Sequence, residues 1–143
     1  MMALLGIGMS ACLCGSASAQ QLDLTQILID KTSVGPEVVS LCDKLCAGNE
    51  KRSWLDSAVL VLRGDQPTSE LVAHIKLQSR HVPIQGVVLY DTTAQVDVTA
   101  EIDNTTCKVT SLTASSSNDL YKLLLSAFRS EIESKATMLG LPC

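Results

Sequence analysis

Two stretches of the chain alternate apolar and polar residues, and this period of two is typical of strands with one buried face. The first covers residues 70–80 and the second covers residues 94–103, with Pro83 and Gly86 interrupting the chain between them. The residues expected to face inward are Leu71, Ala73, Ile75, Leu77, Ala94, Val96, Val98, Ala100 and Ile102. Residues 58–62 form a continuous apolar run, which favours a strand covered on both faces. Together these stretches predict an antiparallel meander of four to five strands.

The connections between these strands also allow predictions of register. A two-residue turn at Asn104-Thr105 would place Ile102 opposite Cys107 on the buried face. The same turn would pair Glu101 with Lys108 on the other face. In the preceding hairpin, a symmetric turn around Ile84 would mix buried and exposed positions. We therefore expect a bulge near residues 91–93, because one extra residue restores the alternation.

Apolar residues at helical spacing predict three helices around this sheet. A short helix is expected from Leu24 to about Lys31, opened by Asp23 and Gln26 as a capping box. A second begins near Pro36 and ends before Gly48. The longest follows the Ser- and Asn-rich residues 116–119 and runs to about residue 139. The expected fold is therefore α+β, with short N-terminal helices and a long C-terminal helix packed on one face of the sheet.

The first nineteen residues resemble a secretory signal peptide. An apolar stretch from Met2 to Cys14 is followed by Ala17-Ser18-Ala19, and cleavage is expected after Ala19. No basic residue precedes the apolar stretch, which departs from the usual pattern. Two alternatives remain: a lipoprotein anchored at Cys12, or an uncleaved helix. The expected organisation is a signal peptide at 1–19 and a single disulfide-stabilised domain at 20–143.

Four cysteines remain after this cleavage, and an even number in an exported domain predicts two disulfides. Cys42 and Cys46 are four residues apart on a predicted helix, where their side chains would stack instead of converging. We therefore expect one of them to pair with Cys107 and the other with Cys143. The Cys-x-x-x-Cys spacing does not match a redox motif, and no histidine pattern suits zinc, so no cofactor or metal is expected.

Composition excludes several partners. The chain has 143 residues and a net charge of −4, with 46% hydrophobic and 3% aromatic residues. This length suits one domain, and the acidic balance leaves no basic footprint for nucleic acid. After residue 19 no apolar run is long enough to span a bilayer.

Few residues offer catalytic chemistry. His74 is expected on the polar face of its strand and His81 in a loop. Asp97, Glu101 and Asp103 form an acidic stripe that we interpret as a solvated strand face. No catalytic residues are therefore assigned.

Two short motifs remain. Arg63-Gly64-Asp65 spells the integrin-binding tripeptide but suits an ordinary turn, and its function is left open. Asn104-Thr105-Thr106 is an N-glycosylation sequon at an expected turn.

Three functional hypotheses follow. The first is an exported, non-enzymatic domain that binds a protein or a cell-envelope component in the periplasm, the envelope or the extracellular space. The polar face of the sheet and the loops at residues 64–69 and 82–86 are its candidate surfaces. The second is a carrier of an apolar small molecule or lipid between the sheet and the C-terminal helix, because few large aromatics are available to fill that space. The third is a small secreted hydrolase using Asp97, Glu101 or His74.

Overall fold

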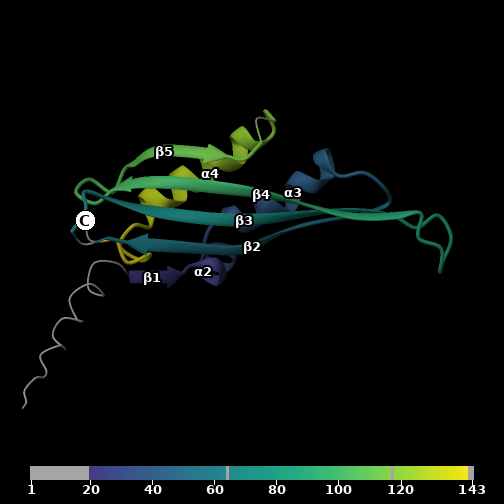
Figure 1. Ribbon diagram of the computed structural model, residues 1–143, viewed down its shortest axis with the longest axis horizontal. Helices are drawn as coiled ribbons and strands as arrows, with labels where there is room; N and C mark the ends of the chain where they lie inside the picture. The colour runs from purple at the N-terminus through teal and green to yellow at the C-terminus, as the bar shows by residue number, and fades with distance from the viewer. Residues whose placement is uncertain (1–19, 64, 117, 142–143) are drawn as a thin grey trace, which may run out of the picture.

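The computed structural model describes residues 20–63, 65–116 and 118–141. Five strands and three helices follow one another along this part of the chain, in the order shown in Figure 1. They are β1 (Gln20–Asp23), α2 (Thr25–Lys31), α3 (Val34–Leu45), β2 (Glu50–Leu62), β3 (Thr68–His81), β4 (Tyr90–Asp103), β5 (Val109–Ala114) and α4 (Tyr121–Ser134). The strands lie in chain order in one sheet, and each neighbouring pair is antiparallel. The expected mixed α+β class with an antiparallel meander is confirmed.

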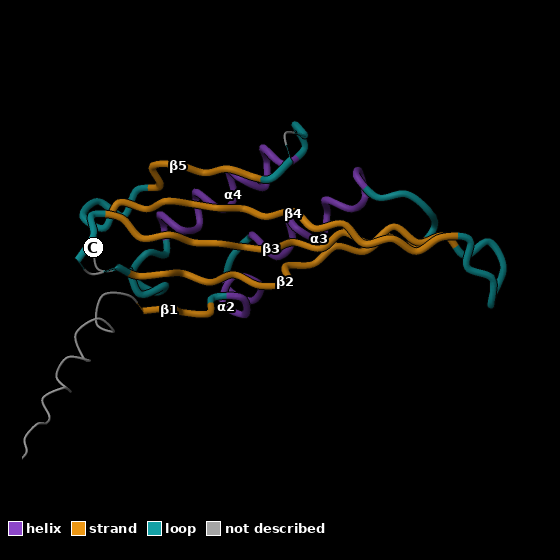
Figure 2. Tube along the Cα trace, in the orientation of Figure 1, coloured by secondary structure: helices purple, strands orange, loops and turns teal. Residues whose placement is uncertain are grey.

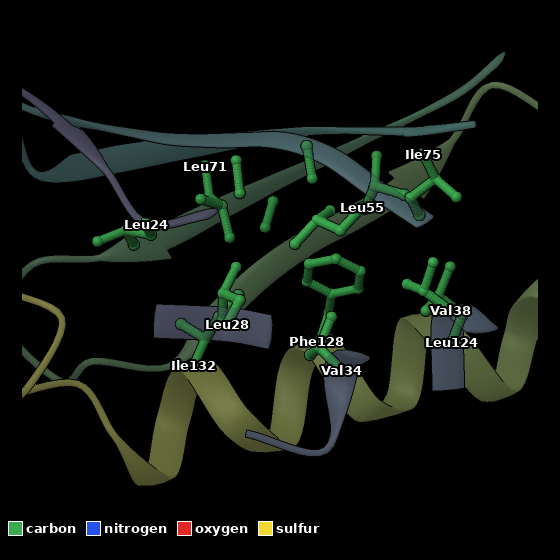
Figure 3. Close-up of a cluster of buried hydrophobic side chains, with 14 of the residues drawn as sticks. Leu24, Leu28, Val34, Val38, Leu55, Leu71, Ile75, Leu124, Phe128 and Ile132 are labelled. Carbon is green, nitrogen blue, oxygen red and sulfur yellow. The ribbon is translucent and has the colours of Figure 1, made fainter. Parts of the chain in front are cut away.

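The hydrophobic core lies between the inner face of the sheet and the helices (Figure 3). Alternate residues of β3 are buried, and Phe128 and Ile132 of α4 have no solvent exposure. Leu28 of α2 and Val38 of α3 join the same cluster. Each buried aliphatic or aromatic side chain of this kind contributes roughly 1.5–3 kcal/mol of transfer free energy. One core thus holds all three helices to the sheet.

The β3–β4 hairpin shows that the predicted bulge near residues 91–93 is wrong. The two strands pair in a single register from Thr68 opposite Asp103 to His81 opposite Tyr90. The centre of the connection lies between residues 85 and 86 and not at Ile84. This even-numbered connection brings inward-facing residues together without any insertion.

The predicted two-residue turn after β4 is also wrong. Ile102 lies opposite Val109 instead of Cys107, and Glu101 lies opposite Ser111 instead of Lys108. The carboxylate of Asp103 accepts hydrogen bonds from the backbone N–H groups of Thr105 and Thr106, at 2.7 and 3.1 Å. Cys107 has a positive φ of 59°. These local interactions stabilise a longer turn than the alternation alone suggests.

A bulge does occur, but in β2, where the register with β3 shifts between Leu55 and Ser57. β1, which the hydrophobic pattern did not predict, pairs only with Val59–Leu62 at one end of β2. The edge of β2 is therefore covered by a strand over only part of its length.

The helix boundaries differ from the predicted ones. α3 begins at Val34, before Pro36, and α4 ends at Ser134, followed by turns. The carboxylate of Asp23 accepts the backbone N–H of Thr25 at 3.0 Å, whereas the Gln26 side chain donates to Asp30 at 2.9 Å. The expected capping box between Asp23 and Gln26 does not form.

Cys42 and Cys46 form a disulfide with each other. The predicted cross-links from these two cysteines to Cys107 and Cys143 are therefore wrong. α3 ends at Leu45, and Cys46 has extended backbone angles, with φ −93° and ψ 156°. This change of backbone direction brings the two Cα atoms to 4.7 Å, within bonding range. Cys107 is itself disulfide-bonded, and Cys143 lies outside the described residues.

The signal peptide predicted at 1–19, including Cys12 and the cleavage point after Ala19, also lies outside the described residues. Over the part of the chain that is described, no helix has the length and apolar character to cross a membrane.

Candidate interaction surface

β3 and β4 continue past the end of α3 as a narrow arm, which Figures 1 and 2 show projecting from the body of the molecule. The loop at residues 82–89 joins the two strands at its far end. The helices that cover the inner face elsewhere do not reach this end of the hairpin (Figure 2). Side chains at the end of the arm therefore face solvent.

The end of the arm is strongly apolar. We define the hairpin tip as residues 82–90. Its large apolar side chains are exposed, with Ile84 68% and Leu89 63% accessible. The other exposed members are Pro83, Val87, Val88 and Tyr90. A contiguous apolar patch at the surface of a small domain is typical of an interaction site.

The tip is held in a defined conformation by its backbone. The N–H of Val87 donates to the carbonyl of Ile84 at 2.9 Å, which closes a four-residue turn. Gly86 has a φ of +85°, a conformation that a side chain disfavours and that glycine adopts freely. The N–H of Leu89 donates to the carbonyl of His81 at 2.9 Å. The apolar side chains thus project from an ordered turn.

Asn49, just before β2, fixes the tip to the chain segment that enters β2. Its side-chain amide donates to the carbonyl of Val82 at 2.7 Å and accepts the N–H of the same residue at 2.8 Å. Gly48 lies directly against Arg80, where an added Cβ would overlap the carbonyl oxygen. This close approach brings the chain entering β2 next to the base of the tip.

Charged side chains at the base of the arm pair across three strands. Arg80 of β3 contacts Glu50 of β2 at 2.7 Å and Asp91 of β4 at 3.6 Å. Gln78 also donates to Asp91 at 2.8 Å. The rings of His81 and Tyr90 stack with centroids 5.8 Å apart. These contacts hold the arm as a three-stranded ribbon where helices are absent.

The outer face of the sheet carries a polar cluster around His74. Its Nδ1 lies 2.6 Å from the carboxylate of Asp97, directly opposite on β4, and Gln95 donates to the same carboxylate at 2.7 Å. The hydrogen bonds from His74 and Gln95 lower the pKa of Asp97. The strand register thus brings together two residues of the hydrolase hypothesis.

Ser57 of β2 lies opposite His74 in register, so serine, histidine and aspartate occupy one row across three strands. The described hydrogen bonds join His74 to Asp97 but not to Ser57. A catalytic triad needs a nucleophile hydrogen-bonded to its base, and this row lacks that contact.

The remaining acidic residues of the stripe are not assembled with this pair. Glu101 lies four residues further along the strand, roughly 13 Å away at about 3.3 Å per residue. The carboxylate of Asp103 is engaged by the turn that follows β4. Paired glycosidase carboxylates are about 5–9.5 Å apart, so Asp97 and Glu101 do not meet that spacing. Among the described residues, no group of three or more potential metal ligands is clustered.

Asn104, the residue of the sequon, uses its side chain within the fold. The amide nitrogen donates to the carbonyls of Gln66 and Arg63 at 3.0 and 3.3 Å. The amide oxygen accepts the hydroxyl of Ser69 at 2.6 Å. Asn104 therefore fastens the β2–β3 turn, and glycosylation there stays a prediction. Gly64 of the Arg-Gly-Asp tripeptide lies outside the described residues.

The space between the sheet and α4, where a carried ligand was expected, contains the buried side chains of Leu124, Phe128 and Ile132 (Figure 3). An open space of about 490 Å³ lies elsewhere, between α2, α3 and β2. The carrier hypothesis stays a prediction.

No protein-family model matches the chain, and comparison with curated proteins and with solved structures finds no match either.

The sequence partly indicated this surface. The loop at residues 82–86 was a candidate, but the apolar residues 87–90 were not included. In the sequence, residues 87–90 are marked by an unbroken apolar run directly after Gly86, without the alternation of the following strand. Such a run suits a buried strand equally well, and only the length of the arm leaves it exposed.

Proposed function

We propose that this chain is an exported, non-enzymatic binding domain that holds a partner protein through the hairpin tip. The observation that carries this proposal is the exposure of Ile84, Val87, Val88, Leu89 and Tyr90 on an ordered turn at the end of the arm. Burying apolar surface stabilises a protein by roughly 25 cal/mol for each Å², and these exposed side chains do not gain that free energy. An apolar cleft on a partner would recover this free energy, and the fixed turn lowers the entropic cost of binding.

The net charge of the chain favours a protein partner over an anionic membrane surface. Insertion into an anionic bilayer is usually assisted by unpaired Lys and Arg residues. Arg80, next to the tip, is paired with Glu50 and Asp91. Among the described residues, the nearby exposed cations without an ion pair are Lys51 and Arg52, of which Arg52 lies over the Trp54 ring. The net charge of −4 gives no general attraction to anionic lipids. Tyr90 is a residue type enriched at the energetic centres of protein interfaces.

Export is part of the same proposal, with cleavage after Ala19 and release to the periplasm or the extracellular space. The Cys42–Cys46 bond supports it, because disulfides persist in oxidising compartments. The intact mass of the protein from its own host should correspond to residues 20–143 and should rise on reduction. A full-length mass with free thiols would contradict export, and a lipid-modified Cys12 would replace cleavage after Ala19 by lipoprotein anchoring.

The tip is tested by comparing three forms of the protein in quantitative affinity capture from the host's envelope and medium. These are the wild type, the double variant Ile84→Ser/Leu89→Ser, and the control Leu123→Ser. Leu123 is 62% exposed on α4, away from the arm, so the control removes one exposed apolar side chain of the same kind as the two that are removed from the tip. We expect at least one protein to be retained by the wild type and the control and lost from the double variant. With that protein purified, calorimetry should give at least a tenfold weaker affinity for the double variant.

The proposal fails if the double variant retains every protein that the wild type retains. It also fails if the tip residues matter only for binding to phospholipid vesicles, or only for self-association measured by light scattering. Circular dichroism and thermal unfolding of the double variant establish that it remains folded. Because both substituted side chains are exposed, we expect its unfolding midpoint to stay close to that of the wild type.

A further inference from the structure

The edge of β2 that faces away from β3 is only partly covered. β1 pairs with Val59–Leu62, and the N–H of Leu24 extends this coverage to the carbonyl of Ala58. Among the described residues, positions 50–55 of β2 have a strand neighbour on the β3 side only. This open segment ends at the bulge between Leu55 and Ser57. An uncovered strand edge is a template for adding a further strand.

An apolar groove lies beside this open edge. It has a volume of about 490 Å³ and is formed by α2, α3 and β2. Its lining residues include Ile29, Pro36, Val39, Trp54 and Leu55. Val39 is 62% exposed although it lies on the helix next to the sheet edge. The groove can therefore accept side chains from a strand lying along the edge.

Charged residues mark the two ends of the open segment. Lys51 and Arg52 are exposed at one end, and within the described residues neither forms an ion pair. The Arg52 guanidinium lies over the Trp54 ring, 4.7 Å from its centroid. Asp56 lies at the other end, and Asp43 is on the rim of the groove. Because Lys51 and Arg52 point to opposite faces of the strand, an acidic residue of a ligand on the Trp54 face would complement Arg52.

We infer that the open edge of β2 at residues 50–55 binds an extended segment of a partner protein by strand addition. The added strand lies along the same edge of β2 as β1 and forms main-chain hydrogen bonds with β2. Its alternate side chains are apolar and enter the groove beside Trp54, and an acidic side chain at one end lies on the same face of the sheet as Arg52. This mode of recognition draws affinity from the backbone and specificity from the side-chain pockets. The site uses different residues from the hairpin tip and does not depend on it.

The bulge in β2 limits the length of the added strand. Because the register changes at Asp56, a partner strand in register with residues 50–55 loses alignment beyond that point. The site thus selects a short segment. It also protects the edge against indefinite pairing with other copies of the chain.

A library of random peptides displayed on phage provides the probe, selected against the full domain. We expect the recovered peptides to share alternating apolar residues with an acidic residue at one end, and no Pro or Gly within the motif. For a synthetic peptide of that sequence, Val39→Glu should weaken binding at least tenfold, because it places a charge in the groove. Arg52→Ser should weaken the binding of peptides that carry the acidic residue more than the binding of matched peptides with Gln in its place.

Two controls separate this site from others. Leu123→Glu makes the same kind of change on an exposed apolar position of α4 and should leave peptide binding unchanged. The tip variant Ile84→Ser/Leu89→Ser should also bind the peptide normally, so the failure of one proposal is distinguishable from the failure of the other.

Nuclear magnetic resonance locates the bound peptide. We expect the amides of residues 50–55 to shift and to exchange more slowly when the peptide is bound. Replacing one peptide amide that pairs with β2 by an ester should weaken binding, since the main-chain hydrogen bond is lost. Strand addition is wrong if no selected peptide is sensitive to Val39→Glu, or if the shifts map elsewhere.

Discussion

The carboxylate of Asp97 accepts hydrogen bonds from two side chains, one on the neighbouring strand and one on its own. His74 lies opposite on β3, and Gln95 lies two residues earlier on β4. These donors favour the ionised form, which lowers the pKa of Asp97 below its ordinary value. The carboxylate is about half exposed, so solvent screens its interaction with His74.

This lowered pKa predicts a pH dependence of stability. A carboxyl group whose pKa is lower in the folded state stabilises the fold above its unfolded pKa, about 3.9 for Asp. The contribution is lost as the pH falls through the lowered pKa of the folded state. Asp97→Asn should therefore make the unfolding midpoint fall less steeply below about pH 4 than in the wild type. His74→Ala should have the same effect, because it removes the first donor to the carboxylate.

Thermal unfolding at a series of pH values from neutral to about 2.5 measures this effect. An unchanged acid dependence in both variants would show that other carboxylates account for the loss of stability. At neutral pH, we expect only a small change in either variant.

At the scale of elements, the end of α3 determines the disulfide. While the helix continues, side chains four residues apart point in similar directions along one face. The helix stops at Leu45, and the extended backbone of Cys46 turns its side chain toward Cys42. The bond therefore closes a short loop at a helix end and does not link distant parts of the chain.

A short loop predicts a modest contribution to stability. The loop-entropy relation gives about 2 kcal/mol for a closed loop of roughly five residues, against more than 4 kcal/mol for a long one. Cys46→Ala should therefore lower the free energy of unfolding by about 2 kcal/mol or less. Urea unfolding of the variant and the wild type, both without reductant, measures the difference. A loss of more than about 4 kcal/mol would contradict this entropic account and indicate that α3 depends on the bond for its packing.

At the scale of the whole molecule, Phe128 packs between the helices and the sheet. It is the single phenylalanine of the chain, has no solvent exposure, and points from α4 toward the sheet between residues of α3 and β2 (Figure 3). The hairpin arm, in contrast, extends beyond this core. The molecule thus combines one well-covered centre with an arm held by strand pairing and a few polar contacts.

Phe128→Ala should lower the free energy of unfolding by about 3–5 kcal/mol, because it removes buried apolar surface and leaves a cavity. Leu123→Ala on the same helix is the matched control, and we expect a change within about 0.5 kcal/mol for this exposed residue. Urea unfolding followed by circular dichroism measures both. Equal losses in the two variants would contradict a core centred on Phe128.

Local patterns determined much of the fold. The alternation of residues 70–80 and 94–103 predicted two neighbouring strands, because a buried face imposes a period of two wherever the sheet covers it. Buried helix positions such as Val38, Leu124 and Phe128 followed from helical spacing for the same reason. Mixed α+β class and the order of β2 to β5 could therefore be predicted from the sequence, whereas β1 could not.

Tertiary structure decided the pairings and the surfaces. The register of both hairpins, the partner of Cys42 and the row formed by His74 and Asp97 depend on turn geometry, which a pattern of apolar residues does not specify. The exposure of Val87–Tyr90 depends on how far the helices reach along the sheet, and the groove beside Trp54 depends on how little of β2 is covered by β1. Hydrophobic periodicity indicates which side of a helix or strand is buried, because burial selects the residue type at each position. The contacts of the whole chain determine which helices and strands pack together and where one stops covering another.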